Sequence, residues 1–132
     1  MARIIEINGP LVRLELPGAL LGEQVRVGAL GLSGEVIARE GDTALAQLYE
    51  DSTGLAPGEP AEGLGHPLSV ELGPGLLGGI FDGVQRPLEA IWQASGDRIA
   101  RGVQIPALTR DRRWDFTPAA DRLPGMVLNG GD

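Results

Sequence analysis

The chain has neither cysteine nor lysine among its 132 residues. Without cysteine it can form no disulfide and no thiolate metal site, and its composition is compatible with the cytosol. Because lysine is missing, all 11 basic residues are arginine, most simply explained by GC-rich codon usage. These residues therefore contain no P-loop lysine, no Schiff-base lysine and no lysine general base.

Aromatic residues, histidine and positive charge are also scarce. Aromatic residues make up 4% of the chain, so the core has to be aliphatic. The net charge of −7 argues against a nucleic-acid partner, because phosphate binding needs clustered positive charge. His66 is the single histidine, and metal sites and catalytic triads need more than one such group. No apolar run approaches about 18 residues, so no membrane-spanning helix is predicted.

Glycine and proline, in contrast, are abundant, with 21 and 10 residues respectively. Such a composition argues against a helical bundle and favours short strands joined by many turns. An apolar content of 42% is sufficient for a core. The length fits one domain, or one small domain and part of another.

Alternation of apolar and polar residues predicts six short strands. In the first strand Ile5 and Ile7 are expected on the inner face, and in the second Val12, Leu14 and Leu16. The turn-rich stretch 56–63 is interpreted as a stiff connection before the last strand. Six strands without intervening helices predict a mainly β fold with a closed or nearly closed barrel over residues 1–72. The predicted strands are 3–7, 11–16, 24–27, 35–39, 43–49 and 68–72.

The chain changes character after the predicted barrel. Residues 73–97 form a glycine-rich junction with one predicted helix, 86–94, in which Pro87 suits the first turn. Leu88, Ile91 and Trp92 share one face of this helix at helical spacing. The last segment, 98–132, contains two candidate strands, 102–108 and 113–117. The strand-like residues 126–128 have no following partner, so we expect a fragment of a longer protein.

The glycine run contains a literal G-x-G-x-x-G motif at residues 73–78. The dinucleotide fingerprint needs a helix that opens at the third glycine, so that its amides face the pyrophosphate. Here Gly79 and Gly83 make such a helix poor, and Pro74 removes an amide from the cradle. The preceding region reads as hairpins and not as a βαβ unit. The sequence therefore predicts a structural turn.

The remaining polar residues form no recognisable catalytic constellation. The four serines lie in no nucleophile elbow, and the acidic pairs read as solvated loop charges. The basic-aromatic cluster 110–114 could bind an anion, but an exposed tip or a protein contact is the favoured interpretation. No catalytic, cofactor-binding or metal-binding residue is predicted. The candidates weighed were Ser33, Ser52, Ser69, Ser95, Glu50, Asp51, Glu59 and Glu62.

Two long stretches resemble a known family. Residues 34–55 are similar to the barrel segment of the catalytic A subunit (alpha chain) of V-type and A-type rotary ATPases. Residues 68–88, which end in Phe-Asp-Gly-Val-Gln-Arg-Pro-Leu, resemble the segment that follows it. F-type subunits carry a different version of this glycine run. Parts of 101–132 resemble the start of the insertion that other rotary-ATPase subunits lack.

The resemblance implies a six-stranded N-terminal barrel (1–72), a junction with a short helix (73–97) and the start of a truncated β-rich insertion (98–132). It implies that these barrels alternate with B-subunit barrels in a ring, and that the insertion projects near the peripheral stalk. The parent protein would bind Mg-ATP and couple its hydrolysis or synthesis to proton or sodium transport. It would lie in the cytoplasm, peripheral to the membrane and not inserted in it.

None of the family's catalytic groups can be placed on this sequence. Its P-loop lysine, its water-positioning glutamate and the arginine that a neighbouring subunit supplies all lie outside these residues. The chain itself is therefore expected to serve assembly of the subunits and to be inactive alone. Two alternatives remain: a free-standing β-barrel binding module with a small ligand at the glycine run, and a nucleotide-binding enzyme domain that uses the turn at 73–78.

Overall fold

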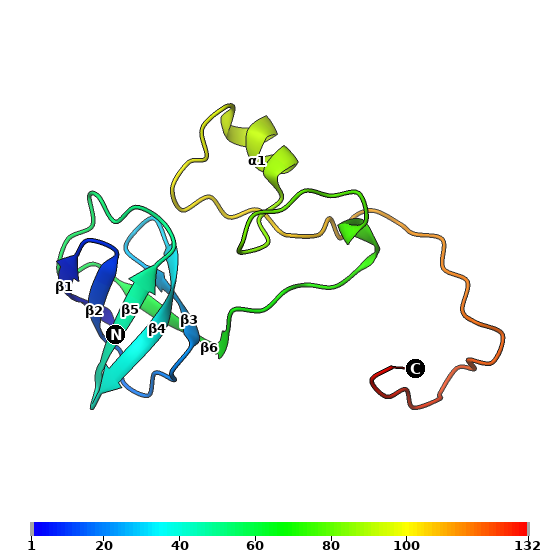
Figure 1. Cartoon of the computed structure of the whole chain (residues 1–132), viewed down its shortest axis with the longest axis horizontal. Helices are drawn as coiled ribbons and strands as arrows, with labels where there is room; N and C mark the ends of the chain where they lie inside the picture. Colours follow the sequence, from blue (N-terminus) through cyan, green and yellow to red (C-terminus); the bar gives the residue numbers. More distant parts are fainter. Residues whose placement is uncertain (1, 132) are drawn as a thin grey trace.

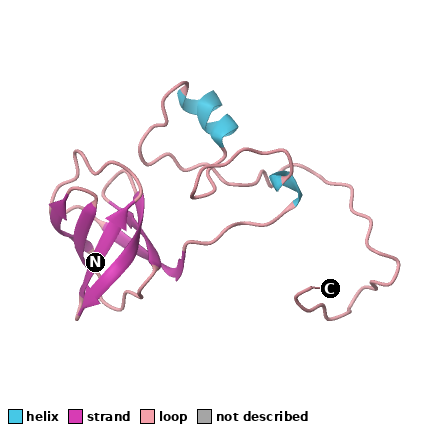
Figure 2. Ribbon diagram, in the orientation of Figure 1, coloured by secondary structure: helices cyan, strands magenta, loops and turns pink. Residues whose placement is uncertain are grey.

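The computed structural model describes residues 2–131, which form a six-stranded barrel followed by long irregular segments (Figures 1 and 2). The mainly β prediction is confirmed. One short α-helix, α1, stands apart from the barrel, and the chain runs away from both toward its end. The elements are β1 (Arg3–Asn8), β2 (Leu11–Glu15), β3 (Glu23–Val27), β4 (Leu32–Glu40), β5 (Thr43–Leu48), β6 (Ala61–Pro67), the 3-10 helix η1 (Pro74–Leu76) and α1 (Leu88–Ser95).

All six strands belong to one antiparallel sheet in the order β1-β2-β5-β4-β3-β6. The segment just before β6 meets β1 through backbone hydrogen bonds around Ile4. Its N–H donates to the carbonyl of Glu59 at 2.9 Å, and its carbonyl accepts from the N–H of Gly58 at 2.8 Å. These bonds close the sheet nearly into the predicted barrel, so that little strand edge is left unpaired.

The barrel interior is aliphatic, as the scarcity of aromatic residues predicted. Alternate residues of each strand point inward, because successive side chains in a strand face opposite sides. The inward prediction for the second strand is confirmed. The cluster of buried residues is Ile4, Val12, Leu14, Leu16, Ala19, Val25, Val27, Leu32, Val36, Ala44, Ala46 and Leu48.

Strand β1 departs from the predicted alternation. Ile4 is the buried residue, with 2% exposure, whereas Ile5 is 44% exposed. A register shift between Ile4 and Glu6 inserts one extra residue opposite β2. Such a bulge places two successive side chains on the same face, so Ile5 and Glu6 both lie outside. Ile7 returns to a half-buried position against the core.

The prediction of a sixth strand at 68–72 is wrong. The sixth strand is β6, which begins inside the stretch interpreted as a stiff connection. Residues 68–72 leave the barrel as irregular chain, and their apolar side chains are exposed, with 63% for Val70 and 79% for Leu72. Apolar alternation here therefore marks a segment that lies outside the barrel core.

A buried carboxylate explains why the sequence pattern does not predict strand β6. Glu23 is only 7% exposed, and its side chain accepts hydrogen bonds from the N–H groups of Leu20 and Gly65, both at 2.8 Å. A Cβ at Gly63 would lie 2.4 Å from Oε1 of Glu23. The strand needs glycine at this position to pass the carboxylate. Glycine otherwise argues against a strand, which is why the pattern misled.

Helix α1 begins two residues later than the predicted range 86–94. Pro87 is its N-cap and not part of its first turn. Ile91 is buried at 1% exposure, but Trp92 is 61% exposed. The predicted common face of Leu88, Ile91 and Trp92 is therefore only partly covered.

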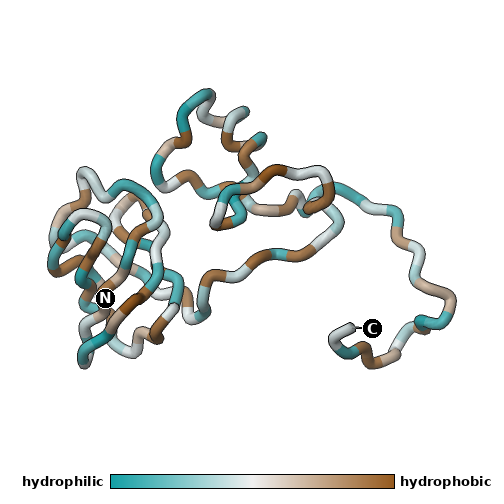
Figure 3. Tube along the Cα trace, viewed as in Figure 1, coloured by the Kyte–Doolittle hydropathy of each residue, from teal (hydrophilic) through white to brown (hydrophobic). Residues whose placement is uncertain are grey.

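The candidate strands 102–108 and 113–117 are also wrong. Residues 98–131 contain no strand, and much of their apolar surface is open, with 84% exposure for Phe116 and 85% for Val127. Figure 3 shows apolar stretches along this extended part of the chain. A strand needs a neighbouring strand for its backbone hydrogen bonds, and the described residues provide none here.

Asp82 organises the turn that leads into α1. Its Oδ1 accepts from the N–H groups of Val84 at 3.1 Å and Arg86 at 2.8 Å, and its Oδ2 accepts from Nε of Arg86 at 2.7 Å. Burial alone would raise the pKa of Asp82, but the hydrogen bonds and the charge of Arg86 outweigh it and lower that pKa. The turn is thus built around an ionised carboxylate.

We expect Gly63→Ala to lower the free energy of unfolding by about 1–3 kcal/mol, the usual cost of overpacking. The added methyl group would press on Glu23, which cannot move without losing its backbone donors. Urea denaturation measures the change. Gly83→Ala is the matched control, because a Cβ there meets nothing within 4 Å. Equal stability of the two variants would contradict this account of β6.

Acid should remove the stabilisation that Asp82 provides. A carboxyl group whose pKa in the folded state lies below its ordinary value of 3.8 stabilises the fold above that value. This contribution is lost as the pH falls through the folded-state pKa. The difference in unfolding free energy between the natural chain and Asp82→Asn should therefore shrink between about pH 5 and pH 2. A difference that does not change with pH in urea titrations would refute the ionised turn.

Candidate functional site

The glycine run does not have the geometry of a dinucleotide fingerprint. After Gly73 the chain forms η1, a single 3-10 turn, and Gly78 follows in the left-handed region with φ 80°. No α-helix opens at Gly78, since α1 begins only at Leu88. The predicted structural turn is confirmed, and no row of helix N-terminal amides is present at this turn.

These glycines allow close packing of a later segment. A Cβ at Gly73 would lie 2.8 Å from Cδ1 of Leu108, and one at Gly75 would lie 3.2 Å from Cδ2 of the same leucine. The ring of Trp114 would be 3.7 Å from the Cβ at Gly75. Gly73 and Gly75 therefore let the side chains of Leu108 and Trp114 lie close to the backbone of the run.

An open cavity of about 600 Å³ lies between this turn, the start of α1 and residues 107–114. The basic-aromatic cluster 110–114 forms part of its wall. Arg110 pairs with Glu71, and the guanidinium of Arg112 lies over the ring of Trp114, 4.1 Å from its centroid. Both arginines therefore already have partners within the chain. The expectation that this cluster makes a protein contact stays a prediction.

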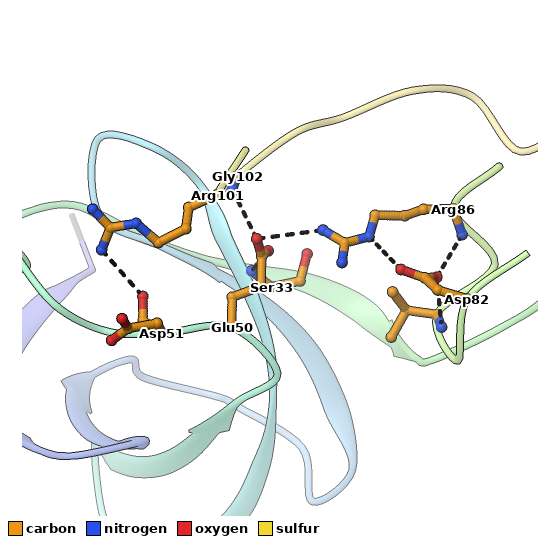
Figure 4. A network of polar contacts seen from close by, with 8 residues as sticks. Ser33, Glu50, Asp51, Asp82, Arg86, Arg101 and Gly102 are labelled. Atoms are coloured by element: carbon orange, nitrogen blue, oxygen red, sulfur yellow. Dashed lines mark hydrogen bonds and ion pairs between the residues drawn. The ribbon is translucent and has the colours of Figure 1, made fainter. Parts of the chain in front are cut away.

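The densest polar network joins the barrel to the junction at Glu50, whose side chain is only 9% exposed (Figure 4). Its Oε1 accepts from the N–H of Ser33 at 3.4 Å. Its Oε2 accepts from the N–H of Gly102 at 2.8 Å and pairs with Nη1 of Arg86 at 3.3 Å. One carboxylate thus contacts three segments that are distant in sequence.

Arg86 lies between two carboxylates, Glu50 and Asp82, as Figure 4 shows. Its side chain is 21% exposed. Burial acts to lower the pKa of Arg86, but its hydrogen bond and charge interaction with Asp82, together with Glu50, raise it further above its ordinary value. The guanidinium is therefore a permanent charge between two acids, which suits a structural tie and not proton transfer.

The interpretation of Glu50 and Asp51 as solvated loop charges is wrong for Glu50. Asp51 is exposed, and it accepts from the N–H and hydroxyl of Thr53 at 2.9 and 2.7 Å, which lower the pKa of Asp51. No local pattern distinguishes the two acids, because the partners of Glu50 include Arg86 and Gly102, far along the chain.

Four other weighed residues make structural contacts within the chain. The ring Nδ1 of His66 lies 2.8 Å from the carbonyl of Pro67, and Glu59 accepts from the N–H groups of Ala29 and Ala56. The hydroxyls of Ser52 and Ser95 donate to the carbonyls of Gly9 and Ile91, at 2.6 and 2.9 Å. Within residues 2–131 no group of three or more histidines and acids is placed to hold a metal ion.

Comparison with known proteins shows which protein family the barrel is similar to. The beta-barrel domain of the ATP synthase alpha/beta family matches residues 4–65, which span nearly all of β1 to β6. Among solved structures, the assembled ATPase EscN in complex with its central stalk EscO, from the type III secretion system of enteropathogenic E. coli, is 29% identical with a TM-score of 0.62. That match covers 66% of this chain and 22% of the EscN chain.

The full-length similarity is to ATP synthases. The V-type ATP synthase alpha chain of Nitrosococcus oceani is 58% identical over 99% of this chain, and the A subunit of the A-type ATP synthase of Thermococcus kodakarensis is 58% identical over 100%. Each match covers 22% of the relative, so the chain spans about a fifth of the length of these curated relatives. The chain therefore belongs to the ATP synthase alpha/beta family, and within it to the A subunits (alpha chains) of the V-type and A-type enzymes.

Proposed function

We propose that this chain is the N-terminal part of the catalytic A subunit of a V/A-type ATPase and that its own role is assembly of the subunits. The observation that carries the proposal is the 58% identity to such proteins along 99% of the chain. The complete protein would bind Mg-ATP at residues outside this chain. It would couple hydrolysis or synthesis of ATP to proton or sodium transport.

The location that we propose is the cytoplasmic head of the complex, peripheral to the membrane. Within residues 2–131, no helix has the length and apolar character needed to cross a bilayer. We divide the chain into a barrel, a junction that includes α1 (to residue 97) and the start of an insertion from residue 98. The barrel part of this division ends with β6 at Pro67 and not at residue 72.

The partner that we propose for the barrel is the barrel of a neighbouring B subunit. Two bulges place apolar side chains on the outer face of the barrel, where they are available for such a contact. The bulge in β1 leaves Ile5 exposed, and a second bulge, between Val36 and Ala38 in β4, leaves Ile37 38% exposed. Both side chains add apolar surface to the outer face of the barrel without contributing to its core.

The strand register brings these two isoleucines to the same level of the sheet. Glu6 pairs with Arg13, Arg13 with Leu45, and Leu45 with Ala38, across β1, β2, β5 and β4. Ile5 and Ile37 stand at the two ends of this row. The row therefore presents apolar residues around one ion pair, Glu6 with Arg13 at 3.5 Å, a composition common in subunit interfaces.

For the segment from residue 98 onward we propose contact with peripheral stalk subunits. The exposed apolar residues Phe116, Leu123 and Val127 support an interaction in the assembled complex.

The alternative, a free-standing module with a small ligand, is favoured by one observation, the cavity beside the glycine run. A gene that continues in frame into a G-x-x-x-x-G-K-[ST] segment would support the ATPase, and a natural stop codon at 133 the module.

We expect the double variant Ile5→Ser and Ile37→Ser to weaken binding to the B-subunit barrel about tenfold or more, because each apolar side chain contributes on the order of 1 kcal/mol when buried. Analytical ultracentrifugation of the whole chain mixed with the B-subunit barrel measures the affinity. Leu77→Ser is the control, since Leu77 is 90% exposed but lies in the junction. An unchanged affinity of the double variant would exclude this face as the interface.

The isolated chain should not bind Mg-ATP. Isothermal titration calorimetry with and without magnesium tests this expectation. A magnesium-dependent site of micromolar affinity would overturn the assembly role and favour a nucleotide-binding domain. A magnesium-independent site lost in Gly75→Leu, which fills the space beside Leu108, would instead favour the ligand-binding module.

A further inference from the structure

Both ends of the chain excursion that contains α1 are attached to the same carboxylate oxygen. Oε2 of Glu50 contacts Arg86, just before the helix, and the N–H of Gly102, after it (Figure 4). The two donors come from the two ends of the excursion, and neither is part of the barrel. Glu50 itself lies two residues after the end of β5 and is held to β4 by the N–H of Ser33. The barrel thus provides a single acceptor for two separate segments.

The segment after α1 crosses the end of the barrel as a strap, defined here as residues 101–104. The guanidinium of Arg101 donates to the carbonyls of Asp51 and Thr53 in the loop after β5. Gly102 has φ 69°, and a Cβ there would lie 2.3 Å from the carbonyl oxygen of Leu30. The strap therefore lies against the loops that end the barrel, and at Gly102 the backbone leaves no room for a side chain.

The other half of the attachment is the junction turn, residues 82–86. Arg86 is held on one side by Asp82, at 2.7 Å, and on the other by Glu50. Within the described chain, the guanidinium of Arg86 bonds to these two acids and not to the strap. Glu50 is therefore the side chain to which both Arg86 and the strap bond.

We propose that Glu50 is a positioning residue that couples the docking of the junction turn and the strap, so that the two segments attach to the barrel and leave it together. A carboxylate with 9% exposure is stable in that place only while its charge is compensated. Without the guanidinium of Arg86, the side chain turns toward solvent, and the N–H of Gly102 loses its acceptor. The orientation of α1 relative to the barrel is then released at both ends. This coupling is independent of the proposed assembly role.

The test is amide hydrogen exchange of the full chain in Arg86→Gln. We expect exchange at Gly102 to become about tenfold faster or more, the size of effect that loss of one charge-assisted hydrogen bond produces. Arg86→Lys retains the charge and should retain most of the protection. Glu62→Ala, which removes an exposed acid of β6, is the control and should leave both segments unchanged.

The outcome that overturns the coupling is unchanged exchange at Gly102 in Arg86→Gln while the turn 82–86 loosens, because the two segments would then dock independently. Protection of core amides such as Val12 and Val25 shows in the same experiment whether the barrel is intact. Glu50→Gln provides a second, independent variant. This variant keeps the acceptor oxygen but removes the charge, and we expect faster amide exchange in both the turn 82–86 and the strap. Faster exchange in the turn alone would also refute the coupling.

Discussion

The closed aliphatic barrel is the constraint on which the rest of the structure depends. It contains every buried apolar residue of the described chain except Ile91. Apolar burial supplies most of the favourable free energy of folding, so the segments after β6 have little of their own. Their positions depend on polar contacts that reach back to the barrel, and the network around Glu50 is the best protected of these.

The sequence was sufficient to predict elements whose stability is local. Strand β2 was found because the buried Val12 and Leu14 alternate with the polar Arg13 and Glu15. The turn between β4 and β5 followed from Gly41. Strands β1 and β6 were misread for reasons that local alternation cannot reveal. A bulge shifts Ile5 outward, and Gly63 is required by a carboxylate on a neighbouring strand. In both cases the decisive partner lies on another strand.

In the candidate site, too, the decisive contacts come from residues far apart in the sequence, which local patterns cannot reveal. Glu50 and Asp51 are adjacent acids in one polar bend, yet Glu50 is a partly buried tie between three segments and Asp51 an exposed loop residue. Their difference arises from Arg86 and Gly102, which the fold brings back to the barrel end. Sequence reasoning could dismiss the glycine motif, because the required helix was locally improbable. It could not find a tie whose members are separated by dozens of residues.

The glycine run combines close packing of its backbone with exposed apolar side chains. Gly73 and Gly75 lie close to the side chain of Leu108, whereas Leu72 and Leu77 in the same stretch are exposed. A segment with a closely packed backbone and exposed apolar side chains is suited to lie between two domains. In the complete protein that we propose, the barrel would be one of these domains. In that protein the contacts of Glu50 would hold both ends of the segment that contains α1 against the barrel.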